Sequence, residues 1–341
     1  MAAQLNRQIV VAARPAGHAQ RSDFEIVTRP MPSVAKGQVG FRNVLISIDP
    51  YQRNLMGNAN SELPPVELGQ PMPGPTVAVV QQSDHPQFAE GDHVVTWSGW
   101  QQYGVSDGSD LRKIDASVAP LSTALGVLGH TGLTAWLGVT EFMTTRPGQT
   151  LVVTAAAGSV GSLAAQLGKQ QGLRVVGIAG GAEKVRFLKH DLGLDDAVDY
   201  KAADVDSQLV RALPQGIDAL LDNVGGRLFE TLMPHFNHHA QVTIAGLIAQ
   251  YTQVDEASGP NRLPALLKLF LYRFITIRSF AMPDYLSRYP AFLAEVAPQV
   301  ASGAIRYNEA FVDGFEGIPD AFLTLFDRTQ SNRGKLIARL D

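Results

Sequence analysis

The sequence predicts an α/β protein with two domains, one mostly β and one with a doubly wound parallel sheet of six strands. Three observations lead to this expectation. Short segments rich in β-branched residues, separated by Gly and Pro, fill the first 120 residues. Beyond residue 150, short apolar segments of strand length alternate with segments of helical periodicity. At residues 150–161 such a strand leads through a glycine turn into a helix, which is typical of nucleotide-binding sheets.

The strands expected in the first domain lie at residues 8–12, 24–28, 40–48, 76–81 and 93–97. Those of the second lie at 150–154, 174–178, 197–200, 217–222, 240–245 and 274–280, with helices at 159–171, 182–191, 207–212, 227–237 and 263–272 between them. A helix is also expected within 122–140, although three glycines weaken it. We therefore expect residues 1–121 and 308–341 to form the first domain, and residues 122–307 the second.

Composition narrows the function classes. The 341 residues include no cysteine, which excludes disulfides, thiol nucleophiles and cysteine-ligated zinc. A net charge of −4 gives no basic surface for nucleic acid or an anionic membrane. The longest apolar tract, 263–280, contains Lys268, Arg273 and Arg278, so we expect no membrane helix there. The first residues lack the apolar stretch of a signal peptide, and we expect a cytoplasmic protein.

The glycine turn is the most informative segment. Gly158 and Gly161 lack side chains, so the backbone can approach a diphosphate and the following helix can pack closely on the sheet. The N-terminus of that helix offers unbonded N–H groups and a favourable dipole to phosphate. Ala156 stands in the place of the first glycine of the usual pattern, and an ordinary tight turn is the alternative interpretation.

The end of the second strand of this domain bears on the choice of cofactor. A site that prefers NAD usually carries Asp or Glu at this position, to accept hydrogen bonds from the adenosine ribose. Here the strand ends in Gly180 and Gly181, which leave room for a 2′-phosphate, and Lys184 in the next helical turn can pair with it. The alternative is that Lys184 is a solvated helix lysine.

Several blocks in order along nearly the whole chain carry a family resemblance. They lie at residues 47–53, 99–103, 125–135, 155–161, 176–188, 216–226, 246–251 and 332–335. In these blocks the sequence resembles the zinc-independent medium-chain dehydrogenase/reductases, specifically the prostaglandin reductase (leukotriene B4 12-hydroxydehydrogenase) and plant double-bond reductase family. The resemblance implies a GroES-like β domain followed by a Rossmann domain, NADPH as cofactor, and reduction of an activated carbon–carbon double bond.

The resemblance also assigns site residues, position by position. For the diphosphate these are Gly158, Ser159, Val160 and Gly161, and for the 2′-phosphate region Lys184, Tyr200 and Asn332. The rest of the cofactor would be lined by Asn223, Ala245, Gly246, Leu247, Ile248 and Tyr251, with Phe280, Ala281 and Met282 near the nicotinamide. Tyr51 and Tyr251 match tyrosines that face the substrate pocket, and we expect them to be the catalytic residues.

Some features depart from the family or suggest other chemistry. The family usually has Met-Pro where this chain has His130 and Thr131, and the turn at 73–76 is poorer in glycine than in the family. The resemblance therefore does not determine the shape of the substrate pocket. Residues 104–108 match the G-x-S-x-G of hydrolases, but no helix is expected directly after the serine. Three histidines at 235, 238 and 239 lack a matching acidic residue, so we expect no metal site.

The leading hypothesis is therefore an NADPH-dependent alkenal/enone reductase that transfers hydride to the β carbon, followed by protonation of the α carbon. A quinone reductase of the same fold and cofactor is one alternative, and a non-enzymatic NADPH-binding sensor or structural protein is another. We expect no nucleic-acid or membrane partner. From the superfamily we expect a homodimer that pairs the strands at 274–280 across a two-fold axis.

Overall fold

A computed structural model describes residues 5–57, 64–252, 261–327, 329 and 332–340. By its contacts the chain divides into two compact units, here called the β unit and the α/β unit. The β unit comprises Met1–Gly129, Glu309–Gln330 and Lys335–Asp341, and the α/β unit comprises His130–Asn308 and Ser331–Gly334. The division after Gly129 lies beyond the expected boundary at 121/122. The short segment 331–334, expected in the first domain, is grouped with the α/β unit.

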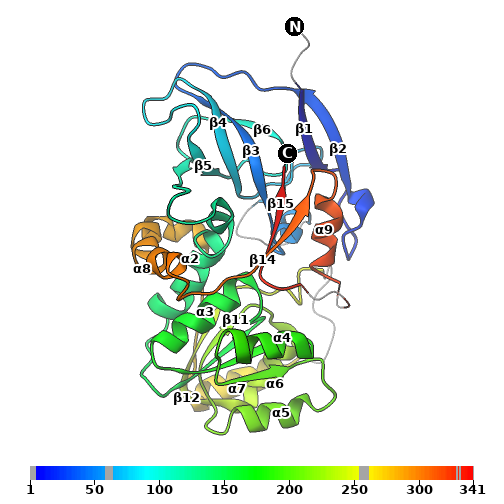
Figure 1. Ribbon diagram of the computed structural model, residues 1–341. Coiled ribbons are helices and arrows are strands. Elements are labelled where there is room, and N and C mark those ends of the chain that lie inside the picture. Colours follow the sequence, from blue (N-terminus) through cyan, green and yellow to red (C-terminus); the bar gives the residue numbers. More distant parts are fainter. Residues whose placement is uncertain (1–4, 58–63, 253–260, 328, 330–331, 341) are drawn as a thin grey trace. The chain divides into compact units, whose positions relative to one another are not determined.

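The β unit is built on a mainly antiparallel sheet with the strand order β14-β15-β3-β4-β5-β7, and β6 also pairs with β3 (Figure 1). The strands are β3 Val39–Ile48, β4 Thr76–Ser83, β5 His93–Thr96, β6 Tyr103–Ser106, β7 Arg112–Lys113, β14 Glu309–Asp313 and β15 Lys335–Arg339. A separate hairpin pairs β1 (Leu5–Val11) with β2 (Phe24–Pro30). Aromatic side chains lie in the core of the β unit. The ring centroid of the fully buried Trp100 lies 5.6 Å from the ring centroids of both Phe24 and Phe322.

Two short helices in the described part of this unit each come after a strand, α1 (Gln52–Leu55) after β3 and α9 (Ile318–Thr324) after β14. Helix α9 carries Pro319 in its first turn, where proline needs no N–H partner. The chain returns from α9 to form β15, which pairs antiparallel with β3 in the middle of the sheet. The C-terminal strand therefore belongs to the core of the β unit.

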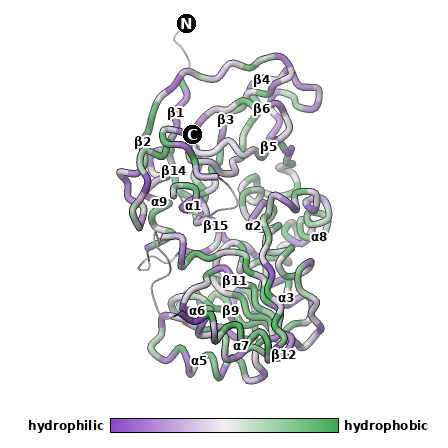
Figure 2. Tube along the Cα trace, turned by 180° about the vertical axis from the view of Figure 1, so that it is seen from behind, coloured by the Kyte–Doolittle hydropathy of each residue, from purple (hydrophilic) through white to green (hydrophobic). Residues whose placement is uncertain are grey.

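The α/β unit contains the expected parallel sheet of six strands, in the order β10-β9-β8-β11-β12-β13. The strands are β8 Thr150–Thr154, β9 Arg174–Ala179, β10 Asp196–Asp199, β11 Ile217–Asp222, β12 Phe236–Ile244 and β13 Thr276–Ser279. The central strands are apolar almost throughout, as strands covered on both faces require; Figure 2 shows this as green runs through β9 and β11. The strand order reverses between β8 and β11, which creates a switch point at their carboxyl ends.

The helices of this unit are α2 His130–Trp136, α3 Ser159–Gln170, α4 Ala182–Arg186, α5 Val205–Ala212, α6 Gly226–Leu232, α7 Leu263–Arg273 and α8 Tyr289–Ala301. One helix ends earlier, and one strand begins later, than the sequence predicts. The helix expected over 227–237 stops at Leu232, since Pro234 follows in a short 3-10 turn. The strand expected from residue 274 begins at Thr276, because Phe274 adopts a left-handed conformation (φ 53°) at the end of α7.

The continuous helix expected within 122–140 is wrong. The structure has a 3-10 turn at Leu121–Leu125, then α2, then a π-turn at Leu137–Glu141. Gly129 explains the break, because a Cβ atom there would lie 2.3 Å from the carbonyl oxygen of Ala124. The chain turns back on itself at this glycine more tightly than a helix with side chains permits.

Candidate functional site

At the switch point of the parallel sheet, hydrogen bonds of side chains and backbone link the ends of β8 and β11. Asp222 accepts a hydrogen bond from the Thr154 hydroxyl (2.6 Å) and others from the N–H groups of Val224 and Gly225. Asn223, a predicted site residue, donates through its side chain to the Thr154 carbonyl (2.8 Å) and through its backbone to the Thr154 hydroxyl (2.8 Å). The pKa of Asp222 is raised by burial. These bonds fix the two strand ends against each other where a ligand binds in such sheets.

The glycine turn follows β8, as predicted. The Gly158 N–H donates to Ala155 (2.9 Å), and the first bond of α3 runs from the Ser162 N–H to the Gly158 carbonyl (2.9 Å). The N–H groups of Ser159, Val160 and Gly161 come before that bond, in the first turn, where helical N–H groups have no intrahelical acceptor. The turn therefore presents a row of donors suited to an anion.

Gly161 is required by packing. A Cβ atom there would lie 2.4 Å from the Ala155 carbonyl oxygen and 2.7 Å from the Ala156 Cα, so α3 can begin only if this residue is glycine. At Gly158 such a Cβ would meet one protein atom within 4 Å, the Ala155 carbonyl oxygen at 3.2 Å, which is a tight contact but not an overlap. Ala156 fits in place of the usual glycine because it faces Gly177 of β9, whose missing side chain makes room for the Ala156 methyl.

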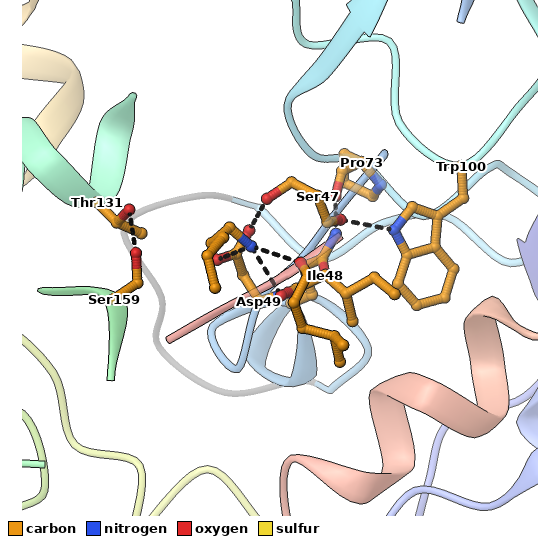
Figure 3. A network of polar contacts seen from close by, with 10 residues as sticks. Ser47, Ile48, Asp49, Pro73, Trp100, Thr131 and Ser159 are labelled. Atoms are coloured by element: carbon orange, nitrogen blue, oxygen red, sulfur yellow. Dashed lines mark hydrogen bonds and ion pairs between the residues drawn. The ribbon is translucent and has the colours of Figure 1, made fainter. Parts of the chain in front are cut away.

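Two further segments reach this turn. Residues 332–334, which carry the predicted Asn332, run beside it: the Gly334 N–H donates to Ala157 (2.9 Å), and Gly158 and Gly334 form a parallel bridge. Figure 3 shows the second contact, between the hydroxyls of Thr131 and Ser159 at 2.7 Å. Thr131 is among the residues at which the sequence is expected to depart from the family pattern. Its hydroxyl thus bonds to the first residue of the helix that presents the N–H groups.

The end of β9 lies beneath Tyr200, one of the predicted 2′-phosphate residues, and beneath Lys201. A Cβ atom on Gly180 would lie 2.9 Å from the Tyr200 ring and 2.7 Å from the Lys201 Cε, so both side chains cover this glycine. Asp199 fixes the arrangement by accepting from the N–H groups of Gly181 (2.8 Å) and Lys201 (2.9 Å). Gly180 therefore lies beneath an aromatic ring and a lysine, while the space beside Gly181 is open.

Charged side chains of both signs lie at this strand end: Lys184 and Lys201 are near Glu183, and Asp199 bonds to the backbone of Gly181. Burial lowers the pKa of Lys184, and the positive charge of Lys201 lowers it further. Lys201 was missed in the sequence analysis, although its place directly after Tyr200 was a usable signal. Arg333 was missed too. Its guanidinium lies 4.7 Å above the Phe187 ring and 3.9 Å from Glu183, next to the helix that carries Lys184.

The predicted loop after β12 is folded onto the end of β11. The N–H groups of Ala245 and Gly246 donate to the Asp222 carbonyl (2.8 and 3.2 Å), and that of Ile248 donates to the Asn223 carbonyl (3.3 Å). The Tyr251 hydroxyl accepts from the Leu247 N–H (3.1 Å). An oxygen that accepts from an N–H retains its own proton for donation, so Tyr251 is both a support of the loop and a possible donor.

The other predicted residues occupy different surroundings. Phe280, followed by Ala281 and Met282, lies in an aromatic cluster with Phe142 (4.8 Å between centroids) and Tyr285 (6.0 Å) next to the edge strand β13. Tyr51 belongs to the β unit, where its half-buried ring packs against the core. Its hydroxyl lies 3.8 Å from where a Cβ atom on Gly74 would be.

The described ranges contain neither a metal-binding cluster nor a membrane-spanning helix. Among those residues no group of three His, Cys, Asp or Glu side chains is placed to hold a metal ion. His238 and His239 lie in strand β12, and the ring of His239 stacks on Phe274 at 5.2 Å. The expected helix-to-strand connection at these two positions is therefore wrong. None of the described helices has the length and apolar character needed to cross a bilayer.

Comparison with known proteins matches both units. Residues 7–114 match a family described as the N-terminal domain of oxidoreductase, and residues 159–297 match one described as zinc-binding dehydrogenase. The chain is 39% identical to an NADPH-dependent curcumin reductase of Escherichia coli K12, over 99% of this chain and 97% of that one. It is 34% identical to an NADP(+)-dependent 2-alkenal reductase of Nicotiana tabacum, over 94% of each.

A solved structure shares the fold. CurA of Vibrio vulnificus, crystallised in complex with NADPH, superposes with a TM-score of 0.93 at 40% identity, covering 98% of this chain and 99% of that one. The coverage includes both units, so the resemblance extends through the switch point, the glycine turn and the β unit.

Proposed function

Because the chain belongs to the zinc-independent medium-chain dehydrogenase/reductases, in the family of prostaglandin and double-bond reductases, we propose that it reduces the activated C=C bond of α,β-unsaturated aldehydes and ketones with NADPH. The observation that carries the proposal is the end of β9. There Gly181 has open space beside it, and Lys184 and Lys201 supply positive charge next to Tyr200. The Asp199 carboxylate at this strand end accepts from the backbone N–H groups of Gly181 and Lys201. This combination fits the phosphate that distinguishes NADPH from NADH.

The chain's residues would bind the cofactor in three parts. The N–H groups of Ser159, Val160 and Gly161 would bind the diphosphate, with Gly158 giving it access to the backbone. Lys184, Lys201, Tyr200 and Asn332 would surround the 2′-phosphate. Asn223 and the loop 245–251 would line the remaining length, with Phe280, Ala281 and Met282 beside the nicotinamide. The roles of Asn332 and of 280–282 rest on the family resemblance.

The bound dinucleotide supplies the hydride that is added to the β carbon. As that bond forms, negative charge moves to the carbonyl oxygen of the substrate, and the α carbon then takes a proton. A hydroxyl that donates to this oxygen stabilises the charge as it develops. We assign that donor to Tyr251, whose hydroxyl keeps its proton while accepting from Leu247, and place Tyr51 at the substrate as a second candidate.

We also propose a homodimer formed through β13. This strand forms one edge of the parallel sheet as far as the described residues show, and most of its side chains are exposed. The adjoining helix α7 exposes apolar side chains in a row: Leu263, Leu267 and Leu271 are each more than half exposed. An unpaired edge beside apolar side chains favours pairing with a second copy.

The test is turnover of NADPH by the purified protein with a small enone, with a quinone, and with no acceptor. We expect consumption with the enone, and mass spectrometry of the product should show the saturated ketone, because the hydride goes to carbon. With NADPH deuterated at the transferred position, the label should appear on the β carbon. Formation of an allylic alcohol, or turnover of the quinone alone, would contradict the proposal. Tight binding without turnover would support a sensor or structural protein.

A metal chelator provides the control on the zinc-independent assignment. The family description that matches residues 159–297 names zinc, whereas the chain has no cysteine to ligate it. We expect prolonged chelation to leave turnover of the enone unchanged. A loss of turnover that added zinc restores would require a metal site.

A further inference from the structure

The β unit contains a buried ion pair between its C-terminal strand and the end of β3. Lys335 Nζ lies 2.9 Å from an Asp49 carboxylate oxygen, and the two side chains are 3% and 5% exposed. The same ammonium group donates to the carbonyl oxygens of Ile48 (2.9 Å) and Leu336 (3.0 Å). An ammonium group has three donors, so Lys335 uses all of them within the protein. Figure 3 shows these contacts around Asp49 and Ile48.

Stability alone does not explain this pair. A buried ion pair gains little over well-packed apolar side chains, because two charges must be taken out of water. The strands are already joined by backbone pairing, with Leu336 opposite Ile48, and Ile337 and Ala338 next along β15 are fully buried in the core. An apolar residue at position 335 would serve the sheet. An ion pair with hydrogen bonds also fixes the orientation of both side chains, which an apolar contact does not.

The bonds of Asp49 lead directly to the segment that carries Tyr51. Its carboxylate also accepts from the Ser47 hydroxyl, and its N–H donates to the side chain of Gln52 (2.9 Å). Gln52 is fully buried and donates in turn to the Pro73 carbonyl (2.9 Å). Asp49 and Gln52 therefore hold the chain on both sides of Tyr51.

Gly74 completes the arrangement. A Cβ atom there would lie 2.5 Å from the Gln52 amide nitrogen, so a side chain at this position would displace Gln52. The same Cβ atom would stand at ordinary contact distance, 3.8 Å, from the Tyr51 hydroxyl. The turn at 73–76 is a point at which the sequence is expected to depart from the family pattern. Here the turn supplies one acceptor for Gln52 and the space beside Tyr51.

We propose that Lys335 is a positioning residue for the reduction: through Asp49 and Gln52 it holds the Tyr51 hydroxyl at the place from which it faces the substrate. The inference rests on the proposed function, because it assumes that Tyr51 acts on the substrate. Lys335 itself touches neither substrate nor cofactor, so its effect on catalysis is indirect.

The first test is a double-mutant cycle on kcat/KM for a small enone. Lys335→Met leaves Asp49 buried without a counter-charge and can impair folding, so the neutral pair Lys335→Met/Asp49→Asn is measured beside it. If Lys335 acts through Tyr51, each should lower kcat/KM about 10–100-fold when Tyr51 is present, as displacement of a reacting group does. In the Tyr51→Phe background the same substitutions should have little further effect. An equal loss in both backgrounds would overturn the proposal.

The second test observes Tyr51 itself. With tyrosine replaced by 3-fluorotyrosine, the resonance of Tyr51 is the fluorine signal that disappears in Tyr51→Phe. Lys335→Met/Asp49→Asn should shift or split that signal. Lys113→Met, which removes the ion pair with Asp92 (2.6 Å) in the same unit, should leave it unchanged. If Tyr51→Phe alone keeps full activity, Tyr51 has no role in the proposed reaction. The positioning of Tyr51 by Lys335 is then tested by the fluorine signal alone, and an unshifted signal in Lys335→Met/Asp49→Asn overturns it.

Discussion

Lys201 lies directly over Gly180, so closely that a Cβ atom on the glycine would stand 2.7 Å from the lysine Cε. Burial lowers the pKa of Lys184, and the charge of Lys201 lowers it further, against an opposing effect of Glu183. Two ammonium groups held beside an open strand end repel each other, and an anion placed between them removes the repulsion.

The first prediction concerns cofactor choice. Lys184→Ala should weaken binding of NADPH about ten- to a hundredfold, because a charge-assisted contact contributes about 1.5–3 kcal/mol. NADH lacks the phosphate, so its affinity should change little. Lys201→Ala should act in the same direction. Binding titrations with both cofactors measure the effect. Lys189→Ala is the matched control, since Lys189 follows α4 but pairs with Asp196 at 3.0 Å. Equal losses for NADPH and NADH would show that Lys184 does not contact the phosphate.

The second prediction concerns pH. Lys184 binds phosphate in its charged form, and its pKa in the free protein is lowered from the ordinary lysine value of about 10.4. NADPH affinity should therefore be constant below that lowered pKa and fall as the pH rises through it. It should also weaken below about pH 6, where the phosphate takes up a proton. NADH binding, measured in parallel, should show neither change. Lys184→Arg should move the alkaline limit upward because arginine stays charged; an unmoved limit would assign it to another group.

The third prediction separates the two glycines of the turn. Gly161→Ala should destabilise the protein by about 1–3 kcal/mol, because the new methyl meets backbone atoms at 2.4 and 2.7 Å. Gly158→Ala should lower the melting temperature much less, since its one tight protein contact would be 3.2 Å, and should weaken NADPH binding by obstructing the diphosphate. Thermal unfolding without cofactor and NADPH titration distinguish them. A stable Gly161→Ala protein would show that α3 can begin without this glycine.

The glycine turn could be predicted from the sequence because its residue types act locally. Gly158, Gly161 and the strand before them specify one short piece of backbone whatever surrounds it. The contacts that complete the site could not be predicted from the sequence, because they join distant segments. Gly334 donates to Ala157, and Thr131 bonds to Ser159. No periodicity in either segment indicates its partner.

The same distinction explains the fold. Alternating strands and helices predicted the parallel sheet, since each helix covers the strands on either side of it. The break in the helix expected over 122–140 depends on how Gly129 meets Ala124, a close approach that helix propensity does not describe. Lys201 was overlooked for a related reason. Only the pairing of β10 with β9 brings it over Gly180.

The fourth prediction tests the dimer. Successive N–H groups in a strand point to opposite sides, so of Thr276 and Ser279 one directs its N–H toward β12 and the other toward the open edge of β13. Proline at the outward position should yield a monomer of unchanged melting temperature in light scattering. Proline at the inward position should lower the melting temperature. A native protein that is already monomeric, or two proline variants that both remain dimeric, would place the interface elsewhere.

The last prediction concerns the donor to the substrate oxygen. Tyr251→Phe keeps the ring but removes both the donor and the acceptor of the Leu247 N–H. Losing one donor to a developing oxyanion typically lowers turnover about 10²–10³-fold, so kcat for the enone should fall by that factor. The lost bond to Leu247 should lower the melting temperature slightly, with NADPH affinity much less affected than kcat. Tyr51→Phe is the matched variant in the β unit. If it abolishes turnover while Tyr251→Phe does not, the donor is Tyr51 and Tyr251 only supports its loop. If both variants and their combination stay active, neither tyrosine stabilises the charge, and the chain contributes by positioning the substrate and cofactor.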